Sequence, residues 1–150
     1  MNGTMRDRPN ALARVLGFGG LIPFVGLALA SWMAPSVYQP EVLRALAAYA
    51  ATIASFLGAL HWGAAMHRND LNTAVLLAWG VVPSLVAWLA LLTNPATGLL
   101  VLSVLLVVCF GVDRVMYLRM GLSGWLPMRL QLTAIAGTSC VVAAMSTVAR

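Results

Sequence analysis

Residues 42–66 read VLRALAAYAATIASFLGALHWGAAM, an apolar run with one charged residue, Arg44, near its start. A helix needs about 20 mostly apolar residues to cross the hydrocarbon core of a bilayer, and this run is long enough. Four further apolar runs fill most of the chain. Together they predict transmembrane helices at about residues 12–34, 42–66, 72–93, 97–117 and 128–148. We therefore expect an all-α protein, a bundle of five transmembrane helices in a single domain that spans residues 1–150.

The composition argues against a water-soluble domain. The chain is 61% hydrophobic and 9% charged, whereas soluble domains have about 25% charged residues. Its net charge of +5 is the balance of nine arginines and four acidic residues, and the sequence contains no lysine. Arginines at helix ends serve as orientation signals and phospholipid contacts. We therefore expect these arginines to contact the lipid bilayer, and we expect no nucleic-acid partner.

The arginines also predict how the chain is oriented. With the N-terminus inside, the outer segments hold only Arg44 and Arg150, and the inner segments hold seven arginines. The positive-inside rule then places the N-terminus inside and the C-terminus outside. The first apolar run is longer than the 7–15 residues of a signal-peptide core, which favours a retained helix. The seven inner arginines are Arg6, Arg8, Arg14, Arg68, Arg114, Arg119 and Arg129.

Small residues recur every four positions along the 42–66 helix. They form one row of Ala47, Ala51, Ser55, Ala59 and Gly63, beside a second row that contains Gly58. In lipid, small residues allow two helix backbones to approach closely. We therefore expect this helix at the centre of the bundle. The alternative is that an alanine-rich helix produces such rows by chance.

Two prolines interrupt the first and third predicted helices. Pro23 follows Gly20 and Pro83 follows Gly80 in similar four-residue segments sixty positions apart. We expect a helix kink at each proline, where a freed carbonyl is satisfied by neighbours. A weak internal repeat, as found in some transporters, is the alternative.

Polar residues inside the predicted spans are few. The helix directions place His61, Asp113 and Gln131 at a similar depth, near the inner end, with Arg129 close to that level. Such groups usually face the bundle interior and find partners, so we expect these four residues to form a polar cluster. One interpretation is structural, with Asp113 paired to an arginine or to His61. The other is functional, with the cluster binding the head group of a quinone or lipid, or relaying a proton.

Patterns of catalytic, metal or cofactor sites are missing from the sequence. It contains neither a CxxC nor an HExxH motif, and no glycine-rich nucleotide loop. His61 and His67 lie six positions apart on one predicted helix and point about 120° apart, so they cannot clasp one haem. Cys109 and Cys140 fall at different depths of apolar runs, which argues against a disulfide. We expect no catalytic residue, no metal and no cofactor.

Four segments suggest a family. The segment from Tyr49 to Gly63 resembles the signature of a small membrane family of unknown function, family 3429 of the domains of unknown function, which includes transmembrane protein 69. Segments 20–24, 79–83 and 125–133 are similar to it as well. The family occurs in bacteria and in mitochondria. The resemblance implies a multi-span protein of a bacterial plasma membrane or the mitochondrial inner membrane, without an established activity.

Short loops, small-residue rows and sparse polar groups favour a non-enzymatic function. Our first expectation is an accessory or assembly subunit of a larger, energy-transducing inner-membrane complex, in contact with other membrane protein subunits. The alternative is a binder or carrier of a small molecule, namely a quinone, a lipid or a proton, at the cluster around His61 and Asp113. An enzyme is the least favoured of the three.

Overall fold

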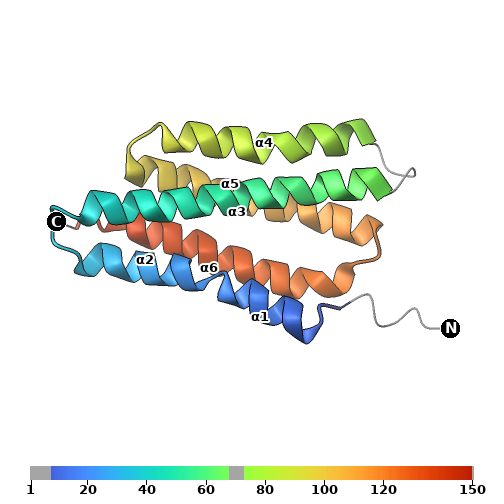
Figure 1. The fold of residues 1–150 in the computed structure, drawn as a ribbon, viewed down its shortest axis with the longest axis horizontal. Helices are drawn as coiled ribbons and strands as arrows, with labels where there is room; N and C mark the ends of the chain where they lie inside the picture. The colour runs from blue at the N-terminus through green and yellow to red at the C-terminus, as the bar shows by residue number, and fades with distance from the viewer. Residues whose placement is uncertain (1–7, 68–72, 150) are drawn as a thin grey trace.

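The computed structural model describes residues 8–67 and 73–149 of the chain, and every regular element within them is helical. Five helical segments are long and apolar enough to cross a membrane, which confirms the prediction of an all-α bundle of five transmembrane helices (Figure 1). The first span begins at one end of the bundle and the fifth span ends at the opposite end, as an odd number of spans requires (Figure 1). The helices are α1 Ala11–Gly19, α2 Ile22–Met33, α3 Gln39–His67, α4 Thr73–Leu91, α5 Pro95–Arg119 and α6 Leu126–Met145, with a short 3-10 turn η1 at Ser123–Trp125.

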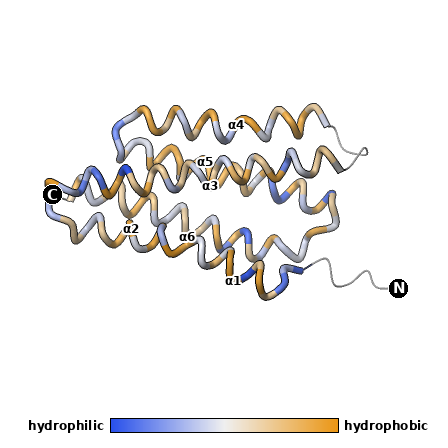
Figure 2. The backbone as a smooth tube through the Cα atoms, viewed as in Figure 1, coloured by the Kyte–Doolittle hydropathy of each residue, from blue (hydrophilic) through white to orange (hydrophobic). Residues whose placement is uncertain are grey.

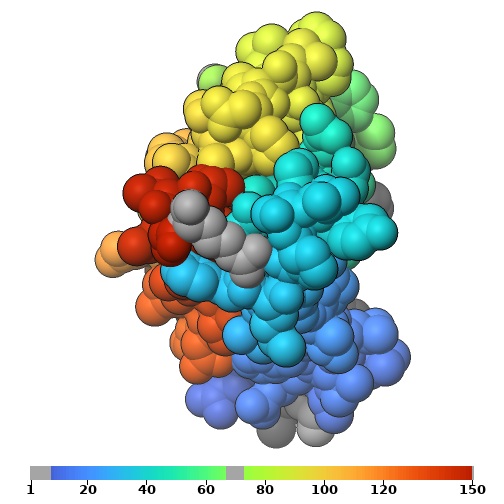
Figure 3. All heavy atoms as spheres, turned by 90° about the vertical axis from the view of Figure 1, so that its left-hand side faces the viewer, coloured from blue at the N-terminus to red at the C-terminus, as the bar shows by residue number. Residues whose placement is uncertain are grey.

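Helix α3 packs against α2, α4, α5 and α6. In the end-on view, α4 and the start of α5 lie at one edge of the cross-section, and α1 and α2 lie at the opposite edge (Figure 3). The middle of the bundle is mostly apolar, and many hydrophilic positions lie towards its two ends (Figure 2). This distribution is the one expected of a protein whose surroundings are hydrocarbon in the middle and water at the ends.

Local sequence signals set the ends of α5. The Asn94 side chain accepts a hydrogen bond of 2.9 Å from the Thr97 N–H, and Pro95 occupies the first turn. At the other end Gly121 has a φ of +70°, which glycine adopts at little cost. The next N–H, of Leu122, bonds the Tyr117 carbonyl at 2.8 Å and closes the helix.

The first span departs from the predicted kink at Pro23. Residues 20 and 21 are turn residues, so the span is two helices, α1 and α2, and Pro23 lies in the first turn of the second. Proline lacks an N–H and clashes with the preceding turn, so the helix stops and restarts. Pro83, in contrast, lies within a continuous α4.

The predicted small-residue row on α3 is buried only in its first part. Ala47 and Ala51 are buried, whereas Ala59 and Gly63 are exposed. Residues four positions apart turn about 40° beyond a full helical turn, so a row of five members winds away from the core. The second row stays inside: Ala50 and Ala54 are 0% exposed and Gly58 is buried.

Gly58 on α3 and Gly80 on α4 bring two backbones into direct contact. A Cβ atom added to Gly58 would collide with the Gly80 carbonyl oxygen. A Cβ atom added to Gly80 would collide with the Trp62 ring, whose Nε1 donates a 3.0 Å hydrogen bond to the Leu77 carbonyl. Close approach of this kind is what small residues provide in membrane proteins.

Candidate ligand-binding site

Asp113 and Arg129 form a buried ion pair between α5 and α6. The Asp113 side chain is 0% exposed and the Arg129 side chain 12% exposed. Arg129 donates from Nε to Asp113 Oδ2 at 3.0 Å, and its Nη2 donates to the same oxygen. The sequence explains why the two residues meet. Asp113 lies near the last residues of α5 and Arg129 near the first residues of α6, so both are at the same end of the bundle.

His61 on α3 faces the other oxygen of the same carboxylate. Its Nε2 lies 3.5 Å from Asp113 Oδ1, which is longer than an N–H···O hydrogen bond. Its Nδ1 lies 3.2 Å from the Leu57 carbonyl oxygen, one turn earlier on α3. Among the described residues, neither His61 Nε2 nor Asp113 Oδ1 has a hydrogen-bond partner. The structure therefore brings three of the four residues of the expected cluster together.

Gln131 does not join this cluster. It is exposed and lines a groove with Arg8 and Arg14 near the start of α1. Two helical positions correspond to about 200° of rotation, so Gln131 points away from the face of α6 that carries Arg129. Thr133, four positions after Arg129, shares that face and is 6% exposed.

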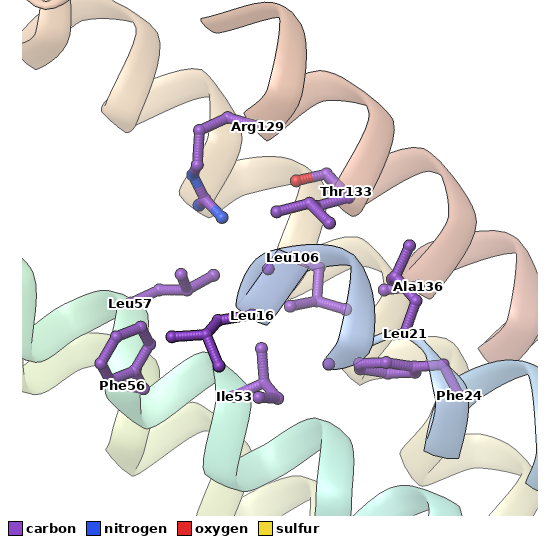
Figure 4. A pocket seen from close by; sticks show the side chains of 13 residues that line it. Leu16, Leu21, Phe24, Ile53, Phe56, Leu57, Leu106, Arg129, Thr133 and Ala136 are labelled. Carbon is purple, nitrogen blue, oxygen red and sulfur yellow. The ribbon is translucent and has the colours of Figure 1, made fainter. Parts of the chain in front are cut away.

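A cavity of about 180 Å³ lies beside the ion pair, where the α1–α2 junction faces α3, α5 and α6. Arg129 is the charged residue among those that line it, and its guanidinium group reaches towards the cavity in Figure 4. Thr133 lies next to it on the same wall. The remaining walls are apolar or backbone and include Leu16, Gly17, Gly20, Leu21, Phe24, Ile53, Phe56, Leu57, Leu106, Leu132 and Ala136.

The break in the first span shapes this cavity and is held by Tyr49. The Tyr49 hydroxyl donates a 2.8 Å hydrogen bond to the Gly20 carbonyl. The Tyr49 and Phe24 rings pack edge to face with centroids 5.1 Å apart. Gly20 and Phe24 both line the cavity, so this contact fixes one of its walls.

Three residues of the site were missed by the sequence reasoning. Tyr49 is the first residue of the family-like segment in α3, and Thr133 is the last residue of the family-like segment 125–133. Neither of them was assigned a role from the sequence. Tyr117 follows Asp113 by one helical turn, and its side chain interacts with Arg129. Spacing of four residues from Asp113 and Arg129 is the signal that could have found Tyr117 and Thr133.

The family model described as "Protein of unknown function (DUF3429)" matches residues 9–145. This chain belongs to the DUF3429 family. The match begins just before α1 and ends with α6, so all five spans and the whole polar cluster lie inside the family region. The family resemblance of the sequence is thereby confirmed, and the chain is a multi-pass membrane protein of a family of unknown function.

Transmembrane protein 69 of Xenopus tropicalis is similar to this DUF3429 chain. The two are 43% identical over 90 residues, which are 59% of this chain and 35% of the Xenopus protein. The chain therefore spans about a third of the length of that relative. No solved structure matches the chain.

Proposed function

We propose that this DUF3429 protein binds a small amphipathic molecule in the cavity beside Arg129. The ligand would place a head group that accepts hydrogen bonds against Arg129 and its apolar body against the leucine and phenylalanine walls. The observation that carries the proposal is an apolar cavity with one charged side chain at its wall. Small-molecule sites typically combine apolar walls with a few well-placed polar groups.

The ion pair supports this proposal because it holds Arg129 in place without using all of its donors. An arginine has five N–H groups, and Asp113 accepts from Nε and Nη2. Donors therefore remain for a ligand oxygen. A charged residue inside a membrane span is costly and is often found at a substrate or ion site, which agrees with this role.

The size of the cavity favours a head group followed by a flexible chain. A volume of about 180 Å³ is smaller than a whole drug-sized ligand requires, since such pockets measure about 300–1,000 Å³. Leu16 and Phe56 line the cavity and are themselves 66% and 60% exposed. A long apolar chain would leave the cavity past these two residues and continue among the lipid chains.

The test is to extract the protein from its native membrane and quantify the quinones and lipids that stay bound. We expect about one amphipathic molecule per wild-type protein, and its loss in Arg129→Gln. Arg114→Gln is the matched control, because Arg114 is an exposed arginine near the same end of the bundle. An extract without any bound amphiphile, or one whose content Arg129→Gln and Arg114→Gln change equally, would contradict the proposal.

An accessory or assembly role in a larger inner-membrane complex is a second candidate, favoured by a different observation. Helix α3 has a row of exposed small residues, namely Ala48, Thr52, Ala59 and Gly63. Small residues on a membrane-facing surface offer a place where a further helix can pack closely. Purification under mild conditions tests this candidate: a stoichiometric partner that Ala59→Leu releases would support it, and a monomer from the native membrane would oppose it.

We also propose an orientation of the protein in its membrane. The described arginines Arg8, Arg14, Arg114, Arg119 and Arg129 lie on segments at the end of the bundle where the chain starts. By the positive-inside rule, this end would face the cytoplasm of a bacterium or the matrix of a mitochondrion. Reporter fusions at each terminus test the orientation. Activity of a periplasmic reporter at the N-terminus and not at the C-terminus would show the opposite orientation.

A further inference from the structure

His61 faces a hydrogen-bond acceptor on each side of its ring. Nδ1 faces the Leu57 carbonyl oxygen at 3.2 Å, and Nε2 faces Asp113 Oδ1 at 3.5 Å. A neutral imidazole carries one N–H, whereas an imidazolium carries two. Either neutral tautomer therefore leaves one pair of acceptors facing each other, and only the protonated ring offers a donor to both.

The net charge of the cluster disfavours a protonated His61 ring. With neutral His61, the charges of Arg129 and Asp113 cancel. A proton on His61 would leave a net charge of +1 in a place where His61 is 4% exposed and Asp113 0% exposed. Uncompensated buried charge is costly, and more so in a membrane span. The cluster alone can satisfy its hydrogen bonds or its charge balance, but not both.

No other titratable group facing His61 supplies the missing negative charge within the described residues. Helix α5 adds the Cys109 thiol and the Tyr117 hydroxyl, both close enough to interact with Asp113. Helix α6 adds Arg129, and its other titratable side chain, Cys140, lies eleven positions further along. Helices α2 and α4, which also pack on α3, carry no titratable side chain. Arg68 and Asp70 lie outside the described residues.

We infer that the site takes up a carboxylate ligand together with one proton, with the carboxylate on Arg129 and the proton on His61. The inference deepens the proposed function and rests on it, because it names the class of the amphiphile as a long-chain carboxylic acid. The bound anion compensates the extra positive charge, and the imidazolium presents an N–H group to each of its two acceptor neighbours. Charge and hydrogen bonds are then balanced at the same time.

The ligand itself supplies the proton that His61 takes up. The neutral acid is the form that enters a hydrocarbon environment at least cost. Because His61 does not line the cavity, the proton passes by way of Asp113: the O–H bond of the acid breaks, and a new N–H bond forms on the side of the His61 ring that faces Asp113 Oδ1. The acid becomes a carboxylate and the imidazole an imidazolium. The net charge of cluster and ligand stays zero. Asp113 lies between the two sites, with Oδ2 on Arg129 and Oδ1 facing His61.

The experiment uses nitrogen-15 NMR of the two histidines of the full-length protein in detergent, freed of native lipid, at pH 8. His67→Gln assigns the signals of His61. The ligands are palmitate with a carbon-13 carboxyl group and methyl palmitate, which has the same chain and no acidic proton. We expect palmitate to convert His61 from one protonated ring nitrogen to two, and methyl palmitate to leave it neutral.

Ala136→Leu is the control variant, since Ala136 lines the cavity and takes no part in the ion pair. Palmitate should no longer change His61 in this variant. Binding of palmitate, seen by its carboxyl signal, with His61 still neutral would overturn the inference and leave the proposed function standing. An imidazolium already present without ligand would overturn it too. Failure of palmitate to bind would overturn it as well, and an amphiphile of other chemistry in the native extract would then still support the proposed function.

Discussion

The Tyr49 hydroxyl donates a 2.8 Å hydrogen bond to the Gly20 carbonyl, which joins the middle of α3 to the break between α1 and α2. A break within a membrane span exposes backbone groups that lipid cannot satisfy, so a neighbouring side chain must do so. Two sequence segments that resemble the same family thus contact each other in space. The contact also explains why the first span can be interrupted next to the cavity.

Removing this hydroxyl should loosen the first span. We expect Tyr49→Phe to lower the free energy of unfolding by about 1 kcal/mol, the typical contribution of one hydrogen bond. Thermal unfolding in detergent, followed by tryptophan fluorescence, measures the loss. Tyr38→Phe is the control, because Tyr38 is 63% exposed in the turn before α3. Equal stability of the two variants would show that the bond to Gly20 does not hold the break.

Adding a methyl group at Gly80 should push α3 and α4 apart. Its Cβ would collide with the Trp62 ring and lie 3.0 Å from the Gly58 carbonyl oxygen. We expect Gly80→Ala to destabilise the protein by about 1–3 kcal/mol, as overpacking usually does. Gly111→Ala is the matched control, since a Cβ there meets nothing within 4 Å. The same unfolding assay applies, and a Gly80→Ala variant as stable as Gly111→Ala would contradict the close packing.

Breaking the ion pair from one side should cost more than removing both charges. Asp113→Asn leaves the Arg129 cation without its counter-charge, which costs about 3–5 kcal/mol at buried pairs. The double variant Asp113→Asn with Arg129→Gln should be more stable than Asp113→Asn alone. Unfolding of the two single variants and the double variant gives the coupling energy directly. Strictly additive losses would mean that the two side chains do not depend on each other.

Filling the cavity should prevent ligand binding without unfolding the protein. Ala136 is 4% exposed and lines the cavity from α6, the helix that also carries Arg129. Ala136→Leu adds about three carbon atoms to a space of about 180 Å³. We expect at least a tenfold loss of bound amphiphile in the native extract, with Arg114→Gln as the unaffected control. Unchanged ligand content in a folded Ala136→Leu protein would place the ligand elsewhere.

The spans could be predicted from the sequence because the bilayer sets their length. Each apolar run has to cover the same hydrocarbon thickness, so its limits appear in composition alone. The depths of His61, Asp113 and Arg129 followed in the same way, from helix direction and distance to a helix end. Span limits and depth in the membrane depend only on position along the chain, so they can be read from the sequence.

Rotation of each helix about its axis could not be predicted in this way. Gln131 and Thr133 are two positions apart, and the packing of α6 in the bundle decides that Thr133 is buried and Gln131 exposed. The same uncertainty affected the α3 row, which winds from buried Ala47 to exposed Gly63. The cavity has no local signal at all, because it arises where a helix break meets three helices that are distant in sequence.

The most direct test of the account is the place where an amphiphile binds. A photoactivatable long-chain carboxylic acid is incorporated into membranes that contain the protein, crosslinked by light, and mapped by mass spectrometry. We predict adducts concentrated on Leu16, Ile53 and Phe56 at the cavity, and their loss in Arg129→Gln. Adducts spread as densely over the exposed α5 residues Val104 and Val107, and unchanged in Arg129→Gln, would contradict a ligand site at Arg129.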